Sequence, residues 1–279
     1  MAAVLSRYQA AVLLAARDAG AASAATSPDL GRTEIEVPLG PDGPVVDGNN
    51  LPWPVIEQIA ESETSCFAIE GGEARKIQGF SEETGRVYTL YPTPGAPTML
   101  VSGVPMHRIK GIDPIEDTRR KIKTIAPIMG RVLDTATGLG YTAIEAARTA
   151  TSVLTIELEE AASEIARQNP WSRELFDNPR IERRIGDSFE VVQELPSSAF
   201  DRIIHDPPLF SLAGELYSGE FYRQLYRLLA PGGRLFHYIG DPESRTGASI
   251  TRSASKRLQS AGFKKITPHP EAFGVVAAK

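Results

Sequence analysis

One short stretch near the middle of the chain, Val132-Leu-Asp-Thr-Ala-Thr-Gly-Leu-Gly-Tyr-Thr-Ala143, limits the folds that are open to the sequence. Its first residues are typical of the end of a buried strand, and the Ala-rich run from Tyr141 to Thr149 indicates a helix. The tight turn between them carries Gly138 and Gly140, which let a ligand approach the backbone closely. A strand, a glycine turn and a helix with free N–H groups at its start predict the first unit of a nucleotide-binding α/β fold.

The chain beyond residue 130 repeats this alternation of strand-like and helix-like runs. The expected strands are Arg131–Thr135, Ser152–Glu157, Ile181–Ile185, Phe200–His205, Gly233–Tyr238, Lys264–His269 and Gly274–Ala278. The expected helices are Ile115–Ile125, Tyr141–Thr149, Glu160–Asn169, Phe189–Glu194, Gly219–Leu229 and Ile250–Ala261. This order predicts an α/β fold with a doubly wound, mostly parallel, seven-stranded sheet. The last two strands have no helix between them, so we expect an antiparallel C-terminal edge.

Residues 1–105 have a different pattern, in which short β-like runs are separated by Gly-rich and Pro-rich segments. They predict a small, mainly antiparallel α+β domain without a recognisable catalytic constellation. The segment that begins at Met106 is a natural junction, because Asp113 is a good N-cap and Pro114 a good first residue for the helix that follows. We therefore expect two domains, 1–105 and 106–279, and the role of the first is open.

Charge and composition narrow the class of protein. Residues 1–105 carry six Lys and Arg against thirteen Asp and Glu, whereas residues 106–279 carry twenty-four against twenty-two. The chain is therefore not a general binder of polyanions, although a local basic face in its second part stays open. No run approaches the roughly 20 apolar residues that cross a bilayer, and the single Cys66 fits a reducing compartment, so we expect a cytoplasmic protein without membrane contact. The four His are scattered and no Cys pair exists, so we expect no metal site.

The ligand of the glycine turn is indicated by three carboxylates at strand ends. The turn matches the dinucleotide fingerprint, so NAD has to be considered. Asp134 would repel a pyrophosphate but attract a ligand with a cationic amino acid end. Glu157 ends the next strand, where its carboxylate can bind ribose hydroxyls, and Asp187 follows the third, where it can accept a hydrogen bond from an adenine amino group. Together they favour an adenosine ligand with an amino acid end over NAD, although Asp187 also fits a simple helix cap.

With these motifs, roughly residues 115–279 resemble a class I S-adenosylmethionine-dependent methyltransferase. The resemblance implies that the glycine turn cradles the methionine part of the donor, that Glu157 holds its ribose and that Asp187 contacts its adenine. The product would be S-adenosylhomocysteine. The donor site that it implies consists of Asp134, Thr137, Gly138, Gly140, Thr142, Glu157, Asp187 and Ser188.

A second constellation, Asp206-Pro207-Pro208-Leu209-Phe210, follows the fourth strand. The prolines remove two N–H donors and leave carbonyls free to accept, so a carboxylate and a carbonyl point into the ligand crevice. Asp206 and the Pro207 carbonyl can accept the two N–H groups of a conjugated amine and turn its lone pair towards an electrophilic methyl. The motif resembles that of amino-methyltransferases acting on adenine N6, cytosine N4, guanine N2 or a glutamine amide. Leu209 occupies the position at which these enzymes have an aromatic residue. We therefore predict that Phe210, one residue later, stacks against the acceptor instead.

The longer string from Ile204 to Tyr217 resembles a little-described methyltransferase group known chiefly from archaea, with bacterial relatives. The resemblance implies N-methylation and names ribosomal RNA cytidine as one acceptor, which makes RNA a candidate partner that the charge itself does not show. The acceptor site that we expect adds five residues to the catalytic Asp206, Pro207 and Phe210, namely His107, Pro208, Leu209, Glu215 and Tyr217. His205 should face the opposite side of the sheet as a packed core histidine.

Other functions remain open at this stage. The acceptor can be a small-molecule or protein amine, which the acidic charge balance favours. The same fold can also carry a polyamine aminopropyltransferase, or a catalytically silent binding module. A basic run can form a phosphate-binding face or plain solvated surface; it comprises Arg119, Arg120, Lys121 and Lys123, with Arg180, Arg183 and Arg184. The number of methyl groups added is open, as is a homo-oligomer.

Overall fold

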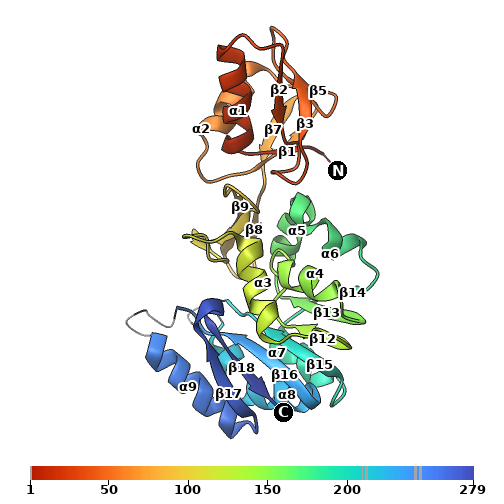
Figure 1. Cartoon of the computed structure of the whole chain (residues 1–279), viewed down its shortest axis with the longest axis vertical. Coiled ribbons are helices and arrows are strands. Elements are labelled where there is room, and N and C mark those ends of the chain that lie inside the picture. Colours follow the sequence, from red (N-terminus) through yellow and green to blue (C-terminus); the bar gives the residue numbers. More distant parts are fainter. Residues whose placement is uncertain (1, 209, 211–212, 242–243, 245–246) are drawn as a thin grey trace. The chain divides into compact units, whose positions relative to one another are not determined.

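The computed structural model describes residues 2–208, 210, 213–241, 244 and 247–279, and it divides the chain into two compact units (Figure 1). The first unit comprises Met1–Ile115 and Ala161–Glu174, and the second comprises Glu116–Glu160 and Leu175–Lys279. None of the helices in the described ranges is long and apolar enough to cross a membrane.

The first unit consists of helices and short antiparallel strands. Helix α1 (Arg7–Asp18) begins with a capping box, in which the Ser6 hydroxyl accepts the N–H of Tyr8 and the Gln9 side chain accepts the N–H of Ser6. Helices α1 and α2 (Trp53–Glu61) share one apolar core with a three-stranded sheet. The strands of this sheet are β1 (Val4–Leu5), β6 (Phe67–Glu70) and β7 (Glu73–Lys76).

The other strands of the first unit form a four-stranded sheet and two hairpin ribbons. The sheet has the order β11 (Val104–Pro105), β10 (Thr98–Val101), β9 (Arg86–Tyr91) and β8 (Gln78–Ser81). The ribbons pair β2 (Ser23–Thr26) with β3 (Ile35–Pro38), and β4 (Val45–Val46) with β5 (Asn49–Asn50). All of these pairs are antiparallel, so the expected α+β class of this part of the chain is confirmed.

The boundary between the units lies about ten residues later than expected from the sequence. Residues 106–115 stay with the first unit because the Asp113 side chain bonds to the Ala96 N–H at 3.0 Å while it caps the following helix at the Ile115 N–H at 2.8 Å. The segment Ala161–Glu174 also belongs there, and it holds most of helix α5 (Glu160–Gln168) and the short turn η1 (Pro170–Ser172).

The second unit is built on a seven-stranded sheet with the order β14-β13-β12-β15-β16-β18-β17. Its strands are β12 (Arg131–Asp134), β13 (Ser152–Glu157), β14 (Ile181–Ile185), β15 (Phe200–His205), β16 (Leu229–Tyr238), β17 (Lys264–His269) and β18 (Gly274–Ala278). The first five are parallel, and β18 pairs antiparallel with both β16 and β17. The expected α/β sheet and its antiparallel C-terminal edge are therefore confirmed.

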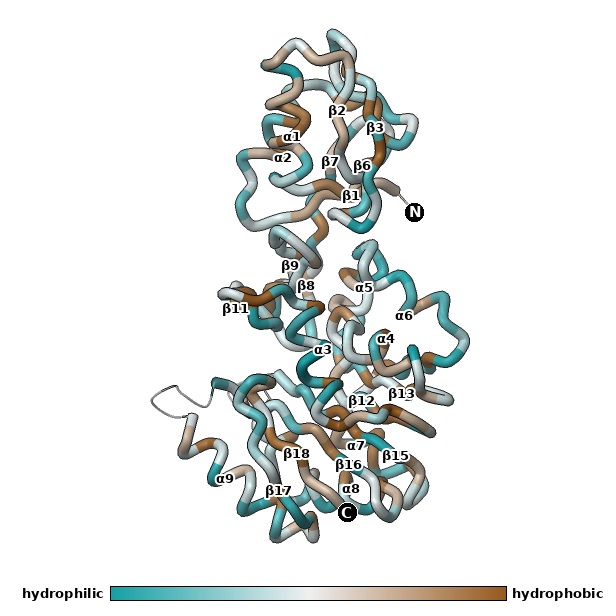
Figure 2. Tube along the Cα trace, in the orientation of Figure 1, coloured by the Kyte–Doolittle hydropathy of each residue, from teal (hydrophilic) through white to brown (hydrophobic). Residues whose placement is uncertain are grey.

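Helices cover the sheet and leave its strand ends to the site. They are α3 (Pro114–Thr124), α4 (Tyr141–Ala147), α6 (Arg173–Asp177), α7 (Ser188–Glu194), α8 (Gly219–Leu228) and α9 (Gly247–Ser260), with the turns η2 (Gly214–Tyr217) and η3 (Pro270–Ala272). Side chains from α7, α8 and α9 join alternate residues of the strands in one buried core, which includes Leu133, Ile203 and Leu235. Figure 2 shows β18 as largely hydrophobic and the edge strand β17 as more hydrophilic.

Candidate active site

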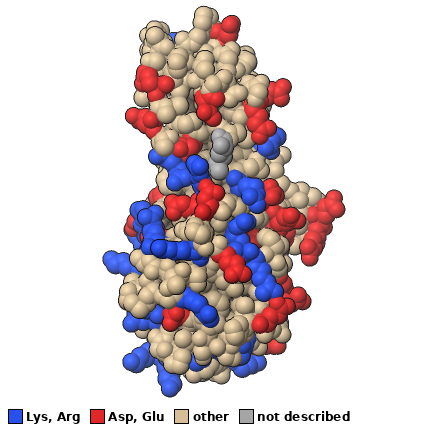
Figure 3. Space-filling view, turned by 90° about the vertical axis from the view of Figure 1, so that its right-hand side faces the viewer, with Lys and Arg blue, Asp and Glu red and all other residues tan. Residues whose placement is uncertain are grey.

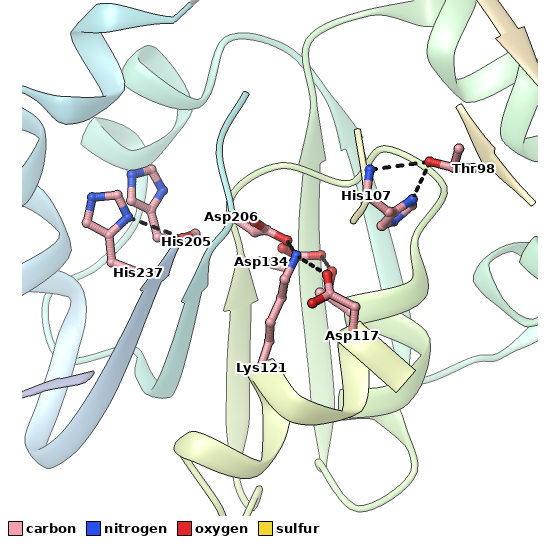
Figure 4. A network of polar contacts seen from close by, with 9 residues as sticks. Thr98, His107, Asp117, Lys121, Asp134, His205, Asp206 and His237 are labelled. Atoms are coloured by element: carbon pink, nitrogen blue, oxygen red, sulfur yellow. Dashed lines mark hydrogen bonds and ion pairs between the residues drawn. The ribbon is translucent and has the colours of Figure 1, made fainter. Parts of the chain in front are cut away.

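The site forms where the strand order reverses. β12 and β15 are parallel neighbours, with Asp134 opposite Ile204, and the chain continues outward from them to β13 on one side and β16 on the other. In open α/β sheets, ligands bind in the crevice at the carboxyl ends of such a pair of strands. Asp134 ends β12, and Asp206 follows β15 directly, so the two carboxylates lie at the carboxyl ends of these two strands (Figure 4).

The glycine turn has a backbone that other residues adopt at a cost. Gly138 and Gly140 have φ of 52° and 75°, in the left-handed region that favours glycine. The N–H of Gly140 donates to the Thr137 carbonyl at 2.7 Å and closes the turn before α4. A Cβ on Gly140 would lie 2.6 Å from Cδ2 of the buried Leu175. The turn is therefore tight and closely packed.

Asp134 is fully buried and only half satisfied. Its Oδ2 accepts the hydroxyls of Thr142 at 2.9 Å and Thr155 at 3.1 Å. Its Oδ1 is buried without a hydrogen-bond partner among the described residues. Burial raises the pKa of Asp134 to about 7, against the opposing effect of the two hydroxyls. A buried carboxylate oxygen without a partner fits the ammonium group of an amino acid ligand.

Glu157 is bonded to the glycine turn rather than standing as a solvated strand end. Its Oε2 accepts the N–H of Gly138 at 2.8 Å, and its Oε1 accepts the N–H of Glu159 at 3.0 Å. Burial raises the pKa of Glu157, and these N–H groups act in the opposite direction. Each carboxylate oxygen has a second lone pair, so this geometry is compatible with ribose binding.

The other residues of the expected donor site have contacts within the fold. The Thr137 hydroxyl lies 2.7 Å from that of Thr155. Asp187 caps α7 by accepting the Phe189 N–H at 2.8 Å, and its contact to adenine stays a prediction. The Ser188 hydroxyl donates to the Thr135 carbonyl at 2.6 Å, so its side chain serves the packing of α7.

Asp206 is held by a buried lysine. Lys121 Nζ lies 2.6 Å from Asp206 Oδ2 and 3.1 Å from Asp117 Oδ2, and the Lys121 side chain is only 2% exposed (Figure 4). The same ammonium lies 4.7 Å from the centre of the Tyr238 ring. Burial alone would lower the pKa of Lys121, but the charges of Asp206 and Asp117 outweigh it and raise the pKa. The lysine therefore stays a cation between two carboxylates.

The residues after Asp206 form an aromatic corner. Tyr217 donates its hydroxyl to the Pro208 carbonyl at 2.9 Å, which fixes the exit of the strand. Phe210 is 58% exposed and packs edge-on against Tyr217 with ring centres 5.5 Å apart. Pro207 is buried and Pro208 is exposed, and Leu209 lies outside the described residues. An exposed ring packed against Tyr217 is a surface on which a flat group can stack.

Two residues of the expected acceptor site do not join this group of contacts. His107 belongs to the first unit, where its Nδ1 lies 2.9 Å from the Thr98 hydroxyl. Glu215 is an exposed residue of η2. Both assignments stay predictions.

His205 is a core residue, as its place in the strand predicts. It is fully buried, with Nδ1 2.7 Å from the Thr135 hydroxyl and Nε2 2.9 Å from the Leu216 carbonyl. Burial lowers the pKa of His205 to about 3, so the ring is neutral. It supports the strand that carries Asp206.

The basic run was left open as a phosphate-binding face or plain solvated surface, and Lys121 belongs to neither because it is buried. The sequence suggested a basic run on the surface, but Pro114, Asp117, Lys121 and Ile125 follow a helical stripe that is buried. This helical spacing predicts that Lys121 is buried, and an interpretation based on charge alone does not use it. On the face drawn in Figure 3, the basic side chains over the second unit are interspersed with acidic ones. Thr155 and Tyr238 are further site residues that the motifs did not predict, since neither belongs to one.

Comparisons with known proteins agree with this fold. The family model described as "Conserved hypothetical protein 95" matches residues 122–229. Spermidine synthase from Thermotoga maritima superposes with a TM-score of 0.57, covering 72% of this chain and 70% of that one at 20% sequence identity. That likeness is one of fold. The sheet order and its antiparallel edge are those of a Rossmann-like α/β fold.

Two sequence relatives with named activities match smaller parts of the chain. Polyamine aminopropyltransferase 2 of Streptomyces coelicolor is 32% identical over 154 residues, which are 51% of this chain and 27% of that protein. Protein-L-isoaspartate O-methyltransferase of Methylorubrum populi is 32% identical over 148 residues, 53% of this chain and 63% of that protein.

A longer match covers both units of the chain. The uncharacterized protein MJ1233 of Methanocaldococcus jannaschii is 42% identical over 232 residues, which are 82% of this chain and 79% of that protein. The chain therefore belongs to the family of this archaeal protein.

Proposed function

We propose that the second unit transfers a methyl group from S-adenosylmethionine to a neutral amine nitrogen. The observation that carries the proposal is the meeting of two different carboxylates at one strand crossover. Asp134 offers a buried oxygen without a partner among the described residues, and Asp206 is fixed by Lys121. Asp134 suits the ammonium group of a cationic donor, and Asp206 suits an acceptor with N–H groups.

The donor would be held by the residues around the glycine turn. Asp134 Oδ1 would receive its ammonium group. Glu157 would bind its ribose and Asp187 its adenine. When bound, S-adenosylmethionine supplies a methyl group that an amine nitrogen takes up with loss of one proton, while the sulfur keeps the electron pair of the broken bond.

The acceptor would be oriented by hydrogen bonds and not by a covalent step. An amine conjugated to a ring or carbonyl is a poor nucleophile because its lone pair is delocalised. The Asp206 carboxylate and the Pro207 carbonyl would accept its two N–H groups and turn the lone pair out of conjugation. The Pro208 carbonyl already accepts the Tyr217 hydroxyl, which is why we assign Pro207.

The leading acceptor class is an exocyclic base amine in RNA, such as cytidine N4. The exposed Phe210 ring beside Tyr217 supports it, because such a ring stacks on a flat base. A small-molecule or protein amine is the alternative.

A second candidate function is aminopropyl transfer to a polyamine precursor. It is favoured by the Streptomyces relative and by three carboxylates, Asp117, Asp134 and Asp206, near one crevice. The donor distinguishes the two functions, because an aminopropyltransferase would use decarboxylated S-adenosylmethionine.

The test offers both donors, each labelled in the group that it would transfer, to the full chain with total RNA, nucleosides, cell protein and putrescine. We expect label from S-adenosylmethionine in a fraction that carries neutral amines. Label from the decarboxylated donor in putrescine would establish the second function instead. No label in any fraction, despite measured binding of S-adenosylhomocysteine, would contradict both.

A further inference from the structure

We propose that Lys121 determines acceptor specificity, by occupying the place at Asp206 that the ammonium group of an alkylamine would need. This inference rests on the proposed function, and it assigns to that site a residue that no motif includes. A polyamine or a lysine side chain would therefore bind poorly at the acceptor site, whereas a neutral amine would bind.

The contacts of Lys121 leave little of its ammonium group unsatisfied. Its Nζ lies 2.6 Å from Asp206 and 3.1 Å from Asp117, with the Tyr238 ring 4.7 Å away. The Lys121 side chain is 2% exposed and that of Asp117 is fully buried, whereas that of Asp206 is 17% exposed. Asp206 is therefore the member of the trio that a ligand can reach.

A cationic acceptor would meet an opposing charge at this position. It needs a carboxylate to bind its ammonium group and then to take a proton, because an ammonium nitrogen has no lone pair. An ammonium at hydrogen-bond distance stabilises the ionised form of a carboxylate, so such a carboxylate is a weak proton acceptor. A second cation beside Lys121 would also be repelled.

A neutral amine makes no such demand. It already has a lone pair, and its binding requires only that Asp206 accept a hydrogen bond, which an ionised carboxylate does well. As the new bond to carbon forms, the nitrogen becomes cationic and strongly acidic, so it can pass its proton to Asp206 although that carboxylate is a weak proton acceptor.

Stability does not explain the trio. A buried ion pair is often no better for folding than apolar side chains of similar size, because desolvation offsets the attraction. Lys121 lies one turn from Asp117 on the buried side of α3, next to the apolar Ile122, and the apolar Ile125 follows the helix directly. A role in ligand choice accounts for charged residues on that stripe.

The variants are designed to remove the cation of Lys121 from the site. Lys121→Met keeps an unbranched side chain that is one atom shorter and uncharged, and Asp117→Asn/Lys121→Met also removes the carboxylate that would lose its partner. Lys123→Met is the matched control, since it makes the same substitution two residues along α3 at an exposed position. Thermal unfolding of each protein establishes that it is folded.

Putrescine binding is measured by calorimetry on the full chain with S-adenosylhomocysteine bound, beside methyl transfer to the neutral acceptor. We expect the double variant to bind putrescine at least about tenfold more tightly than the wild type, and Lys123→Met to match the wild type. Equal putrescine binding by the wild type and both Lys121 variants would overturn the inference. So would methyl transfer from the wild type to putrescine, although the proposed methyl transfer would then stand. If the wild type transfers no methyl group to any acceptor, the proposed function fails, and the binding comparison still decides the role of Lys121.

Discussion

The hydroxyls of Thr142 and Thr155 decide which oxygen of Asp134 is left for a ligand. Both donate to Oδ2, and the buried Oδ1 has no partner among the described residues. Because burial raises the pKa of Asp134 to about 7, this carboxylate is protonated in mild acid and must ionise to attract an ammonium group. Donor binding should therefore depend on pH.

We expect S-adenosylhomocysteine to bind on the order of tenfold more tightly at pH 7 than at pH 5.5, because the ionised fraction of Asp134 grows over that range. The sign follows from the raised pKa, since the binding form is present above it and is lost as the pH falls. Calorimetry at both pH values measures the effect. Asp134→Asn should bind weakly and without this dependence. An equal pH slope in both proteins would contradict the role of Asp134.

Single residues of the site were predictable where a motif fixed their backbone position. Asp134 and Asp206 follow from strand ends, because parallel strands bring their carboxyl ends together. Lys121 was not predictable from charge, since lysine is seldom buried, and only its helical spacing from Asp117 placed it inside. Contacts between distant segments, such as Lys121 with Asp206, follow from tertiary packing.

At the scale of elements, the turn between β12 and α4 leaves little space for a side chain in place of Gly140. Gly140 has φ of 75° and lies against Leu175. Gly232, in β16, has nearly the same φ of 76° but nothing within 4 Å of its potential Cβ. Substitutions at these two glycines therefore distinguish the cost of backbone strain from the cost of steric contact.

Gly140→Ala should reduce the free energy of unfolding by roughly 2–4 kcal/mol, from a left-handed alanine and an overpacked Leu175. Gly232→Ala should cost only about 1 kcal/mol, because it meets the backbone penalty alone. Urea unfolding of both variants measures the difference. Equal losses would show that the close packing at Gly140 contributes nothing.

The elements of the sheet were predicted closely. Ser152–Glu157 and Phe200–His205 are strands with the expected ends, because β-branched and other apolar residues cluster in each of them between helix-like runs. The two-residue strand Val4–Leu5 was missed, since it is too short for a period. Helix α6 was also missed, and its five residues give no amphipathic repeat.

At the scale of the whole molecule, the chain passes between the units three times. Ala161–Glu174 belongs to the first unit although both of its ends continue into the second. Within the first unit, Trp171 Nε1 donates to the Leu30 carbonyl at 3.0 Å, and Arg75 donates to the Gln168 side chain at 3.0 Å. No sequence pattern links residue 30 to residue 171, so this assignment was not predictable.

This connectivity predicts coupled unfolding. The two tryptophans, Trp53 and Trp171, both belong to the first unit, so their fluorescence reports on it, whereas far-UV circular dichroism reports on both units. We expect the same urea midpoint from the two signals, because the first unit cannot unfold without releasing a segment anchored at both ends in the second. Two separate midpoints would show that the units unfold independently.

The central claim is that Asp206 orients the acceptor in a methyl transfer, and Asp206→Ala tests it most directly. Lys121 keeps Asp117 as its partner in this variant, so the fold should survive. The measurement is the single-turnover rate of methyl transfer beside the affinity for S-adenosylhomocysteine. We predict a rate at least about 100-fold lower, with donor affinity within a few-fold of the wild type, because only the acceptor contact is lost. A rate close to that of the wild type would contradict the account.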